Sequence, residues 1–238
     1  MEPIVLSLVI PCYNEGANVP LLLERLASLR GQARGVEFIV VDNGSTDATS
    51  PLFLEAAATS SYIRTVRVAK NQGYGFGILC GLRAAKGRYI GWTHADLQTD
   101  PADAVRALAI LEKERYPEKI FLKGLRHGRP LNDRIFTAGM GIFESLLFMR
   151  PLWDINAQPN IFPRALFGAW ENPPHDFSLD LYALVTAGRL GYSVRRFPVA
   201  FTDRLHGSSN WNVNWRAKLK FIGRTIDFSL KLRARKGI

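Results

Sequence analysis

The stretch Phe38-Ile39-Val40-Val41-Asp42-Asn43-Gly44-Ser45-Thr46-Asp47 sets the fold of this 238-residue chain, because a β-branched run ends there in carboxylates and small polar residues. Two other stretches repeat the pattern: Leu8-Val9-Ile10-Pro11-Cys12-Tyr13-Asn14-Glu15 and Tyr89-Ile90-Gly91-Trp92-Thr93-His94-Ala95-Asp96-Leu97-Gln98-Thr99-Asp100-Pro101. Such runs are typical of buried parallel strands, and ligands of open α/β sheets lie beyond the carboxyl ends of the strands. Three acidic strand ends therefore predict one polar site that binds ribose hydroxyls or a metal.

Helices and strands alternate around these stretches. Apolar spacing, capping residues and terminal Gly or Pro predict helices over 17–30, 47–58, 77–86 and 102–115. Further strands are predicted at 65–68 and 120–124. This alternation predicts an α/β fold in a single domain, with a mainly parallel, Rossmann-like sheet flanked by helices.

The second half of the chain is less regular. The predicted elements there are a helix over 177–188, a strand over 193–199 and a helix over 217–232. The apolar stretch 135–149 is short for a membrane span, so a core or interfacial helix is expected.

The net charge of +10 is unevenly distributed. Residues 204–238 hold nine Lys or Arg and one acid, Asp227. A basic end of this kind predicts an anionic partner, although a solvated helix face would look the same. No base-stacking motif accompanies it, so nucleic-acid binding is not expected. The two cysteines, Cys12 and Cys80, are expected to be reduced thiols in a cytoplasmic protein without a signal peptide.

The sequence lacks the characteristic motifs of several enzyme classes. The glycines at 73, 75, 77 and 81 are spaced G-x-G-x-G-x-x-x-G and follow the third predicted strand, which does not fit the dinucleotide-binding pattern. Neither a Walker motif nor a G-x-S-x-G nucleophile elbow is present. Dehydrogenase, P-loop and serine hydrolase functions are therefore not expected.

A metal site is predicted at the third strand end. Side chains 94 and 96 can face the same way in an extended segment, and Asp96 and Gln98 offer the oxygen ligands that Mg²⁺ and Mn²⁺ prefer. A diphosphate would complete the coordination. The alternative is a turn with a helix-capping Asp.

These motifs together resemble a known family. The chain is similar to family-two inverting glycosyltransferases of the GT-A type, in the branch of dolichol-phosphate mannose synthase and polyprenyl-phosphate sugar transferases. The matching stretches are Val9-Ile10-Pro11-x-Tyr13-Asn14-Glu15, Val41 to Asp47, Asn71-x-Gly73, Ala95-Asp96-Leu97-Gln98-x-Asp100-Pro101, Gly124-Leu125-Arg126 and Pro198-Val199-x-Phe201-x-Asp203-Arg204-x-x-Gly207-x-Ser209.

The resemblance implies roles for individual residues. It implies that the nucleotide-sugar is bound by Pro11, Tyr13, Glu15, Val40, Asp42, Ala95 and Asp96. It places a divalent metal, Mn²⁺ or Mg²⁺, on His94, Asp96 and Gln98. It gives catalytic roles to Asp96, Asp154, Arg126, Arg134 and Arg204, the arginines meeting phosphates of donor or acceptor.

Two departures from the family pattern leave alternatives open. His94 stands where the family has an Asp, so the metal preference shifts, or Asp96 and Gln98 hold the ion alone, or the metal has been lost. Asp154 precedes Gln158-Pro159, which is unlike the commoner Ser-Gly-Phe. Asp154 is therefore expected to orient the acceptor or act as a base, or to serve as a structural cap.

The expected function is inverting transfer of a sugar from a nucleotide diphosphate sugar to a polyprenyl phosphate by a peripheral membrane enzyme. Residues 1–210 would form the glycosyltransferase domain, with a nucleotide-binding half to about 100 and an acceptor half beyond it. Residues 211–238 would form a basic amphipathic helix on an anionic membrane surface. The alternatives are a soluble or glycan hydroxyl acceptor, or a catalytically silent nucleotide-sugar-binding protein.

Overall fold

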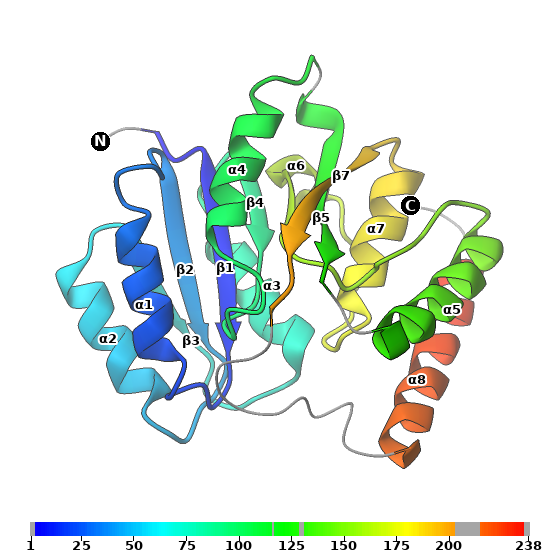
Figure 1. Cartoon of the computed structure of the whole chain (residues 1–238), viewed down its shortest axis with the longest axis horizontal. Helices are drawn as coiled ribbons and strands as arrows, with labels where there is room; N and C mark the ends of the chain where they lie inside the picture. The colour runs from blue at the N-terminus through cyan, green and yellow to red at the C-terminus, as the bar shows by residue number, and fades with distance from the viewer. Residues whose placement is uncertain (1–2, 116, 129–130, 203–214, 236–238) are drawn as a thin grey trace.

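A computed structural model describes residues 3–115, 117–128, 131–202 and 215–235 of the chain. Seven strands form one sheet in the order β3-β2-β1-β4-β6-β5-β7 (Figure 1). Six strands run parallel and β6 runs antiparallel to both of its neighbours. The strands are β1 Leu6–Cys12, β2 Val36–Asp42, β3 Ile63–Arg67, β4 Tyr89–Trp92, β5 Ile120–His127, β6 Asn160–Pro163 and β7 Ser193–Ala200.

Helices cover both faces of this sheet. They are α1 Val19–Ser28, α2 Thr49–Thr59, α3 Tyr74–Ala84, α4 Ala102–Leu111, α5 Leu131–Phe148, α6 Arg164–Gly168, α7 Leu179–Arg189 and α8 Trp215–Ala234, with a 3₁₀ turn at Pro117–Lys119. The helices α1, α2 and α4 contribute to one buried cluster, and α3, α6 and α7 contribute to the other. The sheet is therefore doubly wound, as the alternation predicted.

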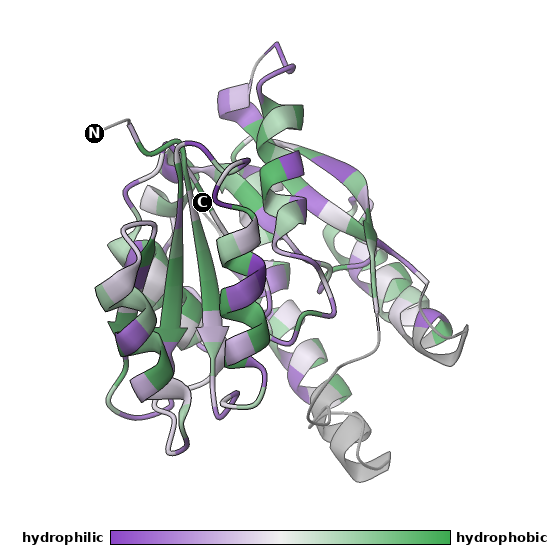
Figure 2. Ribbon diagram, turned by 60° about the vertical axis from the view of Figure 1, so that its left-hand side comes forward, coloured by the Kyte–Doolittle hydropathy of each residue, from purple (hydrophilic) through white to green (hydrophobic). Residues whose placement is uncertain are grey.

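The central strands are apolar because both of their faces are covered. All seven residues of β2 are buried, as are all four of β4. The edge strands β3 and β7 are buried only in part. The hydropathy colouring shows this difference, with the central strands green along most of their length (Figure 2).

Most predicted elements are present, with shifted ends. The helix predicted over 102–115 ends at Leu111, and the one predicted over 77–86 begins a turn earlier, at Tyr74. The strand β6 and the short helix α6 were not predicted. The four residues of β6 are too few to show a period, and their order between β4 and β5 depends on pairing with strands distant in sequence.

The topology defines where a ligand can bind. The chain moves from β1 outward to β2 on one side, and β4 lies on the other side of β1. The crevice between the carboxyl ends of β1 and β4 is thus the switch point of the sheet, which is where ligands of doubly wound folds bind.

The long helices α5 and α8 lie side by side at one end of the sheet (Figure 1). The Ser229 hydroxyl of α8 donates a 2.6 Å hydrogen bond to Glu144 of α5, and both side chains are fully buried. Ser229 and Leu232 therefore fasten the described part of α8 to the core. Among the residues that the structure describes, no helix is long and apolar enough to span a membrane.

Candidate functional site

The three acidic strand ends meet at the switch point. The buried thiol of Cys12, the last residue of β1, lies within the field of Glu15, Asp42, Asp47 and Asp96. Burial first, and then these four carboxylates, raise the pKa of Cys12 well above its ordinary value. The four side chains, here called the carboxylate site, thus come together as the sequence predicted.

Asp42 is the most deeply buried acid of the carboxylate site, with 1% exposure. Its Oδ1 accepts a 2.8 Å hydrogen bond from the backbone N–H of Ser45, and Arg67 lies 3.7 Å from Oδ2. Within the described residues Oδ2 has no hydrogen-bond donor. A buried carboxylate oxygen without a donor is costly, so this atom is placed to accept an N–H or O–H from a ligand.

The other residues predicted to contact the nucleotide lie around Asp42. Tyr13 is 47% exposed after β1, and Glu15 is half-buried, accepting a hydrogen bond from Asn18. Pro11 is half-buried and Ala95 is buried at the same edge. Val40 is fully buried among the core residues of β2, so any contact of Val40 with a ligand stays a prediction.

One participant was not predicted. The Asn43 side-chain amide donates a 2.9 Å hydrogen bond to the carbonyl of Gly73, at the start of α3. Gly73 has φ of +114°, and a Cβ there would collide with the carbonyl of His175. Asn43 thus connects the carboxylate site to a tight glycine turn, which explains why Asn and Gly stand at these positions.

The predicted metal motif follows β4. Asp96 is 4% exposed and its Oδ1 accepts the backbone N–H of Gln98 at 3.2 Å. The ring of His94 lies against Tyr74, with centroids 5.8 Å apart. In the described part of the chain no three His, Cys, Asp or Glu side chains are arranged as a metal site. A buried carboxylate beside an amide and an imidazole fits an ion that takes its remaining ligands from diphosphate and water.

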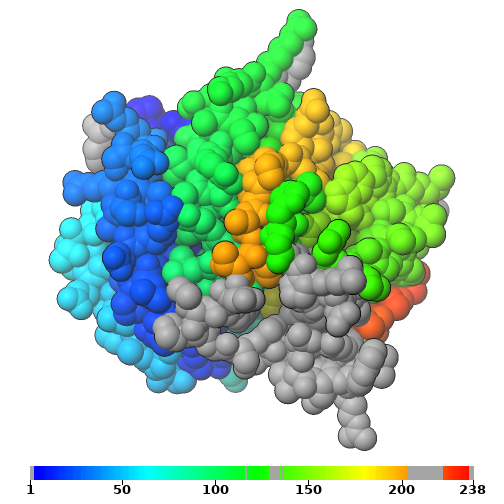
Figure 3. Space-filling model, viewed as in Figure 1, coloured from blue at the N-terminus to red at the C-terminus, as the bar shows by residue number. Residues whose placement is uncertain are grey.

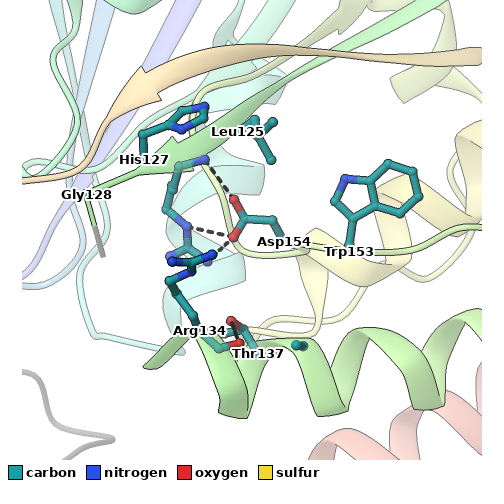
Figure 4. Close-up of a pocket in the computed structure, with 9 residues that line it drawn as sticks. Leu125, His127, Gly128, Arg134, Thr137, Trp153 and Asp154 are labelled. Carbon is teal, nitrogen blue, oxygen red and sulfur yellow. Dashed lines mark hydrogen bonds and ion pairs between the residues drawn. The ribbon is translucent and has the colours of Figure 1, made fainter. Parts of the chain in front are cut away.

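A second site lies at the end of β5. A cavity of about 450 Å³ lies between β5, the start of α5 and the loop before β6 (Figure 4), and is lined by Leu125, Arg126, His127, Gly128, Arg134, Thr137, Ala138, Trp153 and Asp154. In the space-filling view β7 (orange) borders this part of the surface (Figure 3). We refer to it as the Arg126–Asp154 pocket.

An ion pair organises this pocket. Asp154 Oδ2 accepts the backbone N–H of Arg126 at 2.9 Å, and Oδ1 accepts Nε at 2.8 Å and also Nη2 (Figure 4). Burial would raise the Asp154 pKa, but the charge and hydrogen bonds of Arg126 outweigh it and lower that pKa. Asp154 is therefore a weak base that orients Arg126. Arg134 lines the same pocket, whereas Arg204 lies outside the described residues.

The two sites are joined through Thr202. Gln98 Nε2 donates to the carbonyl of Thr202 at 3.1 Å, and the Thr202 N–H donates to the carbonyl of Gln98 at 3.0 Å. The adjacent Phe201 ring lies 5.3 Å from the Arg126 guanidinium carbon. The metal motif and the Arg126–Asp154 pocket thus contact neighbouring residues of one segment.

A buried polar network lies behind both sites. Lys123 is fully buried, with Nζ 2.7 Å from the carbonyl of Ala157, 2.5 Å from Asn160 Oδ1 and 3.8 Å from Asp180 Oδ1. Gln158 and Asn160 both donate to Asp180 Oδ1 at 2.9 Å. Burial lowers the Lys123 pKa to about 7 despite Asp180. A lysine inside the apolar run 120–124 was the sequence signal for this network, which the prediction did not use.

Comparisons with known proteins agree with this geometry. Residues 7–117 match the model of glycosyl transferase family 2. Two similar proteins are undecaprenyl-phosphate 4-deoxy-4-formamido-L-arabinose transferases. The one from Photorhabdus laumondii is 35% identical over 45% of this chain and 34% of its own length, and the one from Pseudomonas paraeruginosa is 39% identical over 43% and 31%. The matched stretch therefore spans about a third of these relatives.

Solved structures share the fold across the whole chain. A mannosyltransferase from Pyrobaculum calidifontis, in complex with GDP-Man and Mn²⁺, aligns with a TM-score of 0.70 at 19% identity, over 100% of this chain and 67% of its own. Glucosyl-3-phosphoglycerate synthase from Mycobacterium tuberculosis, in complex with Mn²⁺, UDP and phosphoglyceric acid, aligns with a TM-score of 0.73 at 18% identity, over 98% and 80%. Residues 7–117 are thus similar to glycosyl transferase family 2, and the chain shares its fold with these solved GT-A glycosyltransferase structures.

Proposed function

We propose that this protein transfers a sugar, with inversion, from a nucleotide diphosphate sugar to a polyprenyl phosphate at a membrane surface. The observation that carries the proposal is the position of an acidic and a basic site on one edge of the sheet. The strands β1, β2, β4 and β5 all run in one direction, so Arg126 near the end of β5 lies on the same edge as Asp42 and Asp96. The Gln98–Thr202 contact joins the two sites.

The carboxylate site would bind the nucleotide. Asp42 Oδ2 would accept a hydrogen bond from the base or ribose, since it is buried without a donor in the described structure. Asp96, Gln98 and His94 would hold a divalent cation. When bound, this cation would supply positive charge that offsets the charge of the leaving diphosphate. Because imidazole is a poorer ligand for Mg²⁺ than a carboxylate, His94 favours Mn²⁺.

The Arg126–Asp154 pocket would bind the acceptor phosphate. Its guanidinium groups suit a phosphate, and Asp154 holds Arg126 in place through three hydrogen bonds. An acceptor phosphate oxygen would attack the anomeric carbon as the bond from that carbon to the diphosphate oxygen breaks. This oxygen is already anionic near neutral pH, so no general base is needed.

A hydroxyl acceptor would place a different demand on the site. A general base would have to remove its proton, and Asp154 is the candidate that the sequence suggested. The charge and hydrogen bonds of Arg126 lower the Asp154 pKa. The backbone N–H and the guanidinium of Arg126 together occupy both carboxylate oxygens of Asp154. This engagement favours the phosphate acceptor over the hydroxyl acceptor.

The membrane part of the proposal depends on α5. Its exposed large apolar side chains are Ile135, Ile142 and Leu146, and Met149 follows directly after the helix, with exposures of 63–82%. The three positions within α5 share one face of the helix, and Arg134 and Arg150 flank the stretch. The described part of α8 is fastened inward through Ser229 and Leu232, so α5 offers the larger apolar face to a bilayer.

The transfer reaction is tested by mass analysis of products from a panel of nucleotide-sugars with polyprenyl phosphates. Asp96→Asn should weaken nucleotide-sugar binding in the presence of metal by about 10–100-fold, as loss of a metal-site contact does, and leave nucleoside binding nearly intact. Asp42→Asn should weaken both. Glu55→Gln, on the exposed face of α2, is the matched control. Unchanged calorimetric binding in both variants would place the nucleotide elsewhere.

The membrane interaction is tested separately with vesicles. Leu146→Asn combined with Met149→Asn should reduce binding to anionic vesicles at low salt, whereas Leu54→Asn, at a 55% exposed position on α2, should not. Equal binding to anionic and neutral vesicles by the unmodified chain would remove the membrane from the proposal and leave sugar transfer itself untouched.

A further inference from the structure

Four arginines lie at, or one or two residues beyond, the C-terminal ends of α5, α7 and α8. They are Arg150, Arg189, Arg233 and Arg235, here called the C-terminal arginine cluster. Arg189 ends α7 just before β7 begins at Ser193. The cluster therefore lies toward the amino ends of the parallel strands, at the edge opposite the carboxylate site.

Contacts between the helices hold these side chains near one another. Arg189 Nη2 donates to the carbonyl of Leu232 at 2.9 Å, which joins α7 to α8. Arg235 Nη1 lies 3.5 Å from the carbonyl of Asn172. The Arg150 guanidinium lies so close to Gly188 that a Cβ at position 188 would collide with Nη1 of Arg150. The end of α7 thus contacts Arg150 and the Leu232 carbonyl of α8, and Arg235 contacts the loop that precedes α7.

Within the described residues, no ion pair offsets the positive charge of the cluster. None of the four arginines forms an ion pair with a carboxylate among the residues described. Asp227, the one acid of α8, pairs with Lys231 at 2.6 Å. Burial, followed by the charges of Arg233, Arg150 and Arg235, lowers the Arg189 pKa. Within the same residues Arg189 Nη1 is buried and has no hydrogen-bond partner.

Helix ends alone explain only part of this arrangement. Basic side chains are favourable near helix C-termini because the last carbonyls are unsatisfied, and the bond from Arg189 to Leu232 is of that kind. That bond does not account for Arg150, Arg233 and Arg189 Nη1, which make no hydrogen bond to a carbonyl in the described structure. Four arginines close enough to lower the pKa of one of them, and without an ion pair in the described structure, create a positive potential that attracts an anion.

We propose that the C-terminal arginine cluster binds a phosphate-bearing anion, supplied by a lipid headgroup or by a soluble phosphate. Planar guanidinium forks match phosphate oxygens better than any other side chain. Leu146 on α5 and Met149 just after it, 75% and 82% exposed, precede Arg150, so a bilayer in contact with α5 would bring its headgroups to the cluster. The proposal does not depend on sugar transfer.

The test uses inorganic phosphate and the full chain labelled with ¹⁵N-arginine, at ionic strength held constant with NaCl. The Nε–H resonances of Arg150 and Arg189 should shift on titration, and Arg233→Gln with Arg235→Gln should weaken the apparent affinity by about tenfold or more. Gly188→Ala should weaken it also, because the added methyl displaces Arg150 without any change of charge. Arg34→Gln with Lys113→Gln, both exposed and distant, should have no effect.

Vesicles separate the two sources of phosphate. If the substitutions weaken binding of free phosphate, the ligand is a soluble phosphate. If they weaken only binding to phosphatidylglycerol vesicles, with phosphatidylcholine vesicles as the control, the ligand is a lipid headgroup. If neither probe responds to Gly188→Ala or to the arginine substitutions, the cluster serves only the helix ends and the proposal is wrong. Should the double arginine variant fail to fold, Gly188→Ala decides the question alone.

Discussion

The carboxylate site and the Arg126–Asp154 pocket are built in opposite ways. The carboxylate site follows directly from three parallel strands, whose register places Cys12 opposite Asp42. The pocket is formed by the end of one strand, the start of a long helix and a loop, and it is organised by one ion pair. Strand register therefore positions the acids of the carboxylate site, whereas a single ion pair, with Asp154, positions Arg126 in the pocket.

This difference predicts that the two sites fail separately. Changes to the pocket should affect the acceptor side and leave nucleotide binding intact, because β1 pairs with both β2 and β4 without it. Changes behind both sites should affect them together. The variants below test this separation, from the largest expected effect to the smallest.

Lys123→Met should have the largest effect, because it acts behind both sites. The substitution leaves buried Asp180 without its cation and Asn160 and Ala157 without a donor. Removing one partner of a buried pair costs about 3–5 kcal/mol, which urea unfolding would measure. Lys123→Met with Asp180→Asn should recover part of this loss, and the exposed Lys113→Met should cost almost nothing. A loss below about 1 kcal/mol would show that the network carries little stability.

Arg126→Gln should disable the pocket alone. Loss of a preorganised donor lowers turnover by about 10²–10³-fold, and Asp154 would lose its fork. Steady-state kinetics with varied acceptor would show the loss, while calorimetric affinity for the nucleotide-sugar should stay within about twofold of the unmodified chain. A parallel loss of nucleotide affinity would break the comparison, since it would mean that the two sites form one unit.

Glu144→Gln should alter the pH dependence of stability through α5. Burial raises the Glu144 pKa to about 7 from 4.5, against the hydrogen bond from Ser229. The folded chain therefore holds a proton that the unfolded chain releases, and this stability is present below about pH 4.5 and is lost as the pH rises through about 7. On the order of 1–3 kcal/mol should disappear between pH 5 and 8.

In urea unfolding at four pH values, Glu144→Gln should lack this decline, whereas Asp227→Asn on the exposed face of α8 should retain it. Because α5 carries Arg134 and Thr137 into the pocket, acceptor affinity should follow the same pH change and nucleotide affinity should not. Identical pH profiles for Glu144→Gln and the unmodified chain would contradict this assignment.

His94→Asp should have the smallest effect and is confined to the carboxylate site. With His94 present, nucleotide-sugar binding should be tighter with Mn²⁺ than with Mg²⁺, and the substitution should move the preference toward Mg²⁺ by about tenfold at most. Calorimetry with each ion, and with chelator as control, gives the ratio without relying on turnover. An unchanged ratio would show that His94, whose ring packs against Tyr74, is not a metal ligand.

The sequence was informative where function depends on strand ends. Asp42 and Asp96 could be placed together because parallel strands end at one edge. The pairing of Arg126 with Asp154 could not be predicted, since 28 positions and the whole of α5 separate them. Nor did the sequence show whether Val40 packs in the core or contacts a ligand. A strand that is buried on both faces has no alternation of polar and apolar residues to distinguish the two. The inward packing of α8 likewise depends on Ser229 and Glu144, a pair 85 positions apart.

The place of β6 has a consequence for how the chain is made. The ribosome makes β5 before β6. In the folded sheet, however, β6 lies between β4 and β5, so β5 cannot take its place in the sheet until β6 has been made and has paired with β4. A nascent chain can thus complete the β3-β2-β1-β4 half while the edge of β4 is still open, and open edges are where strands of different chains pair. Until Asn160–Pro163 leaves the ribosome, the half-made protein is at its most exposed to aggregation, and chaperone binding should be concentrated in that interval.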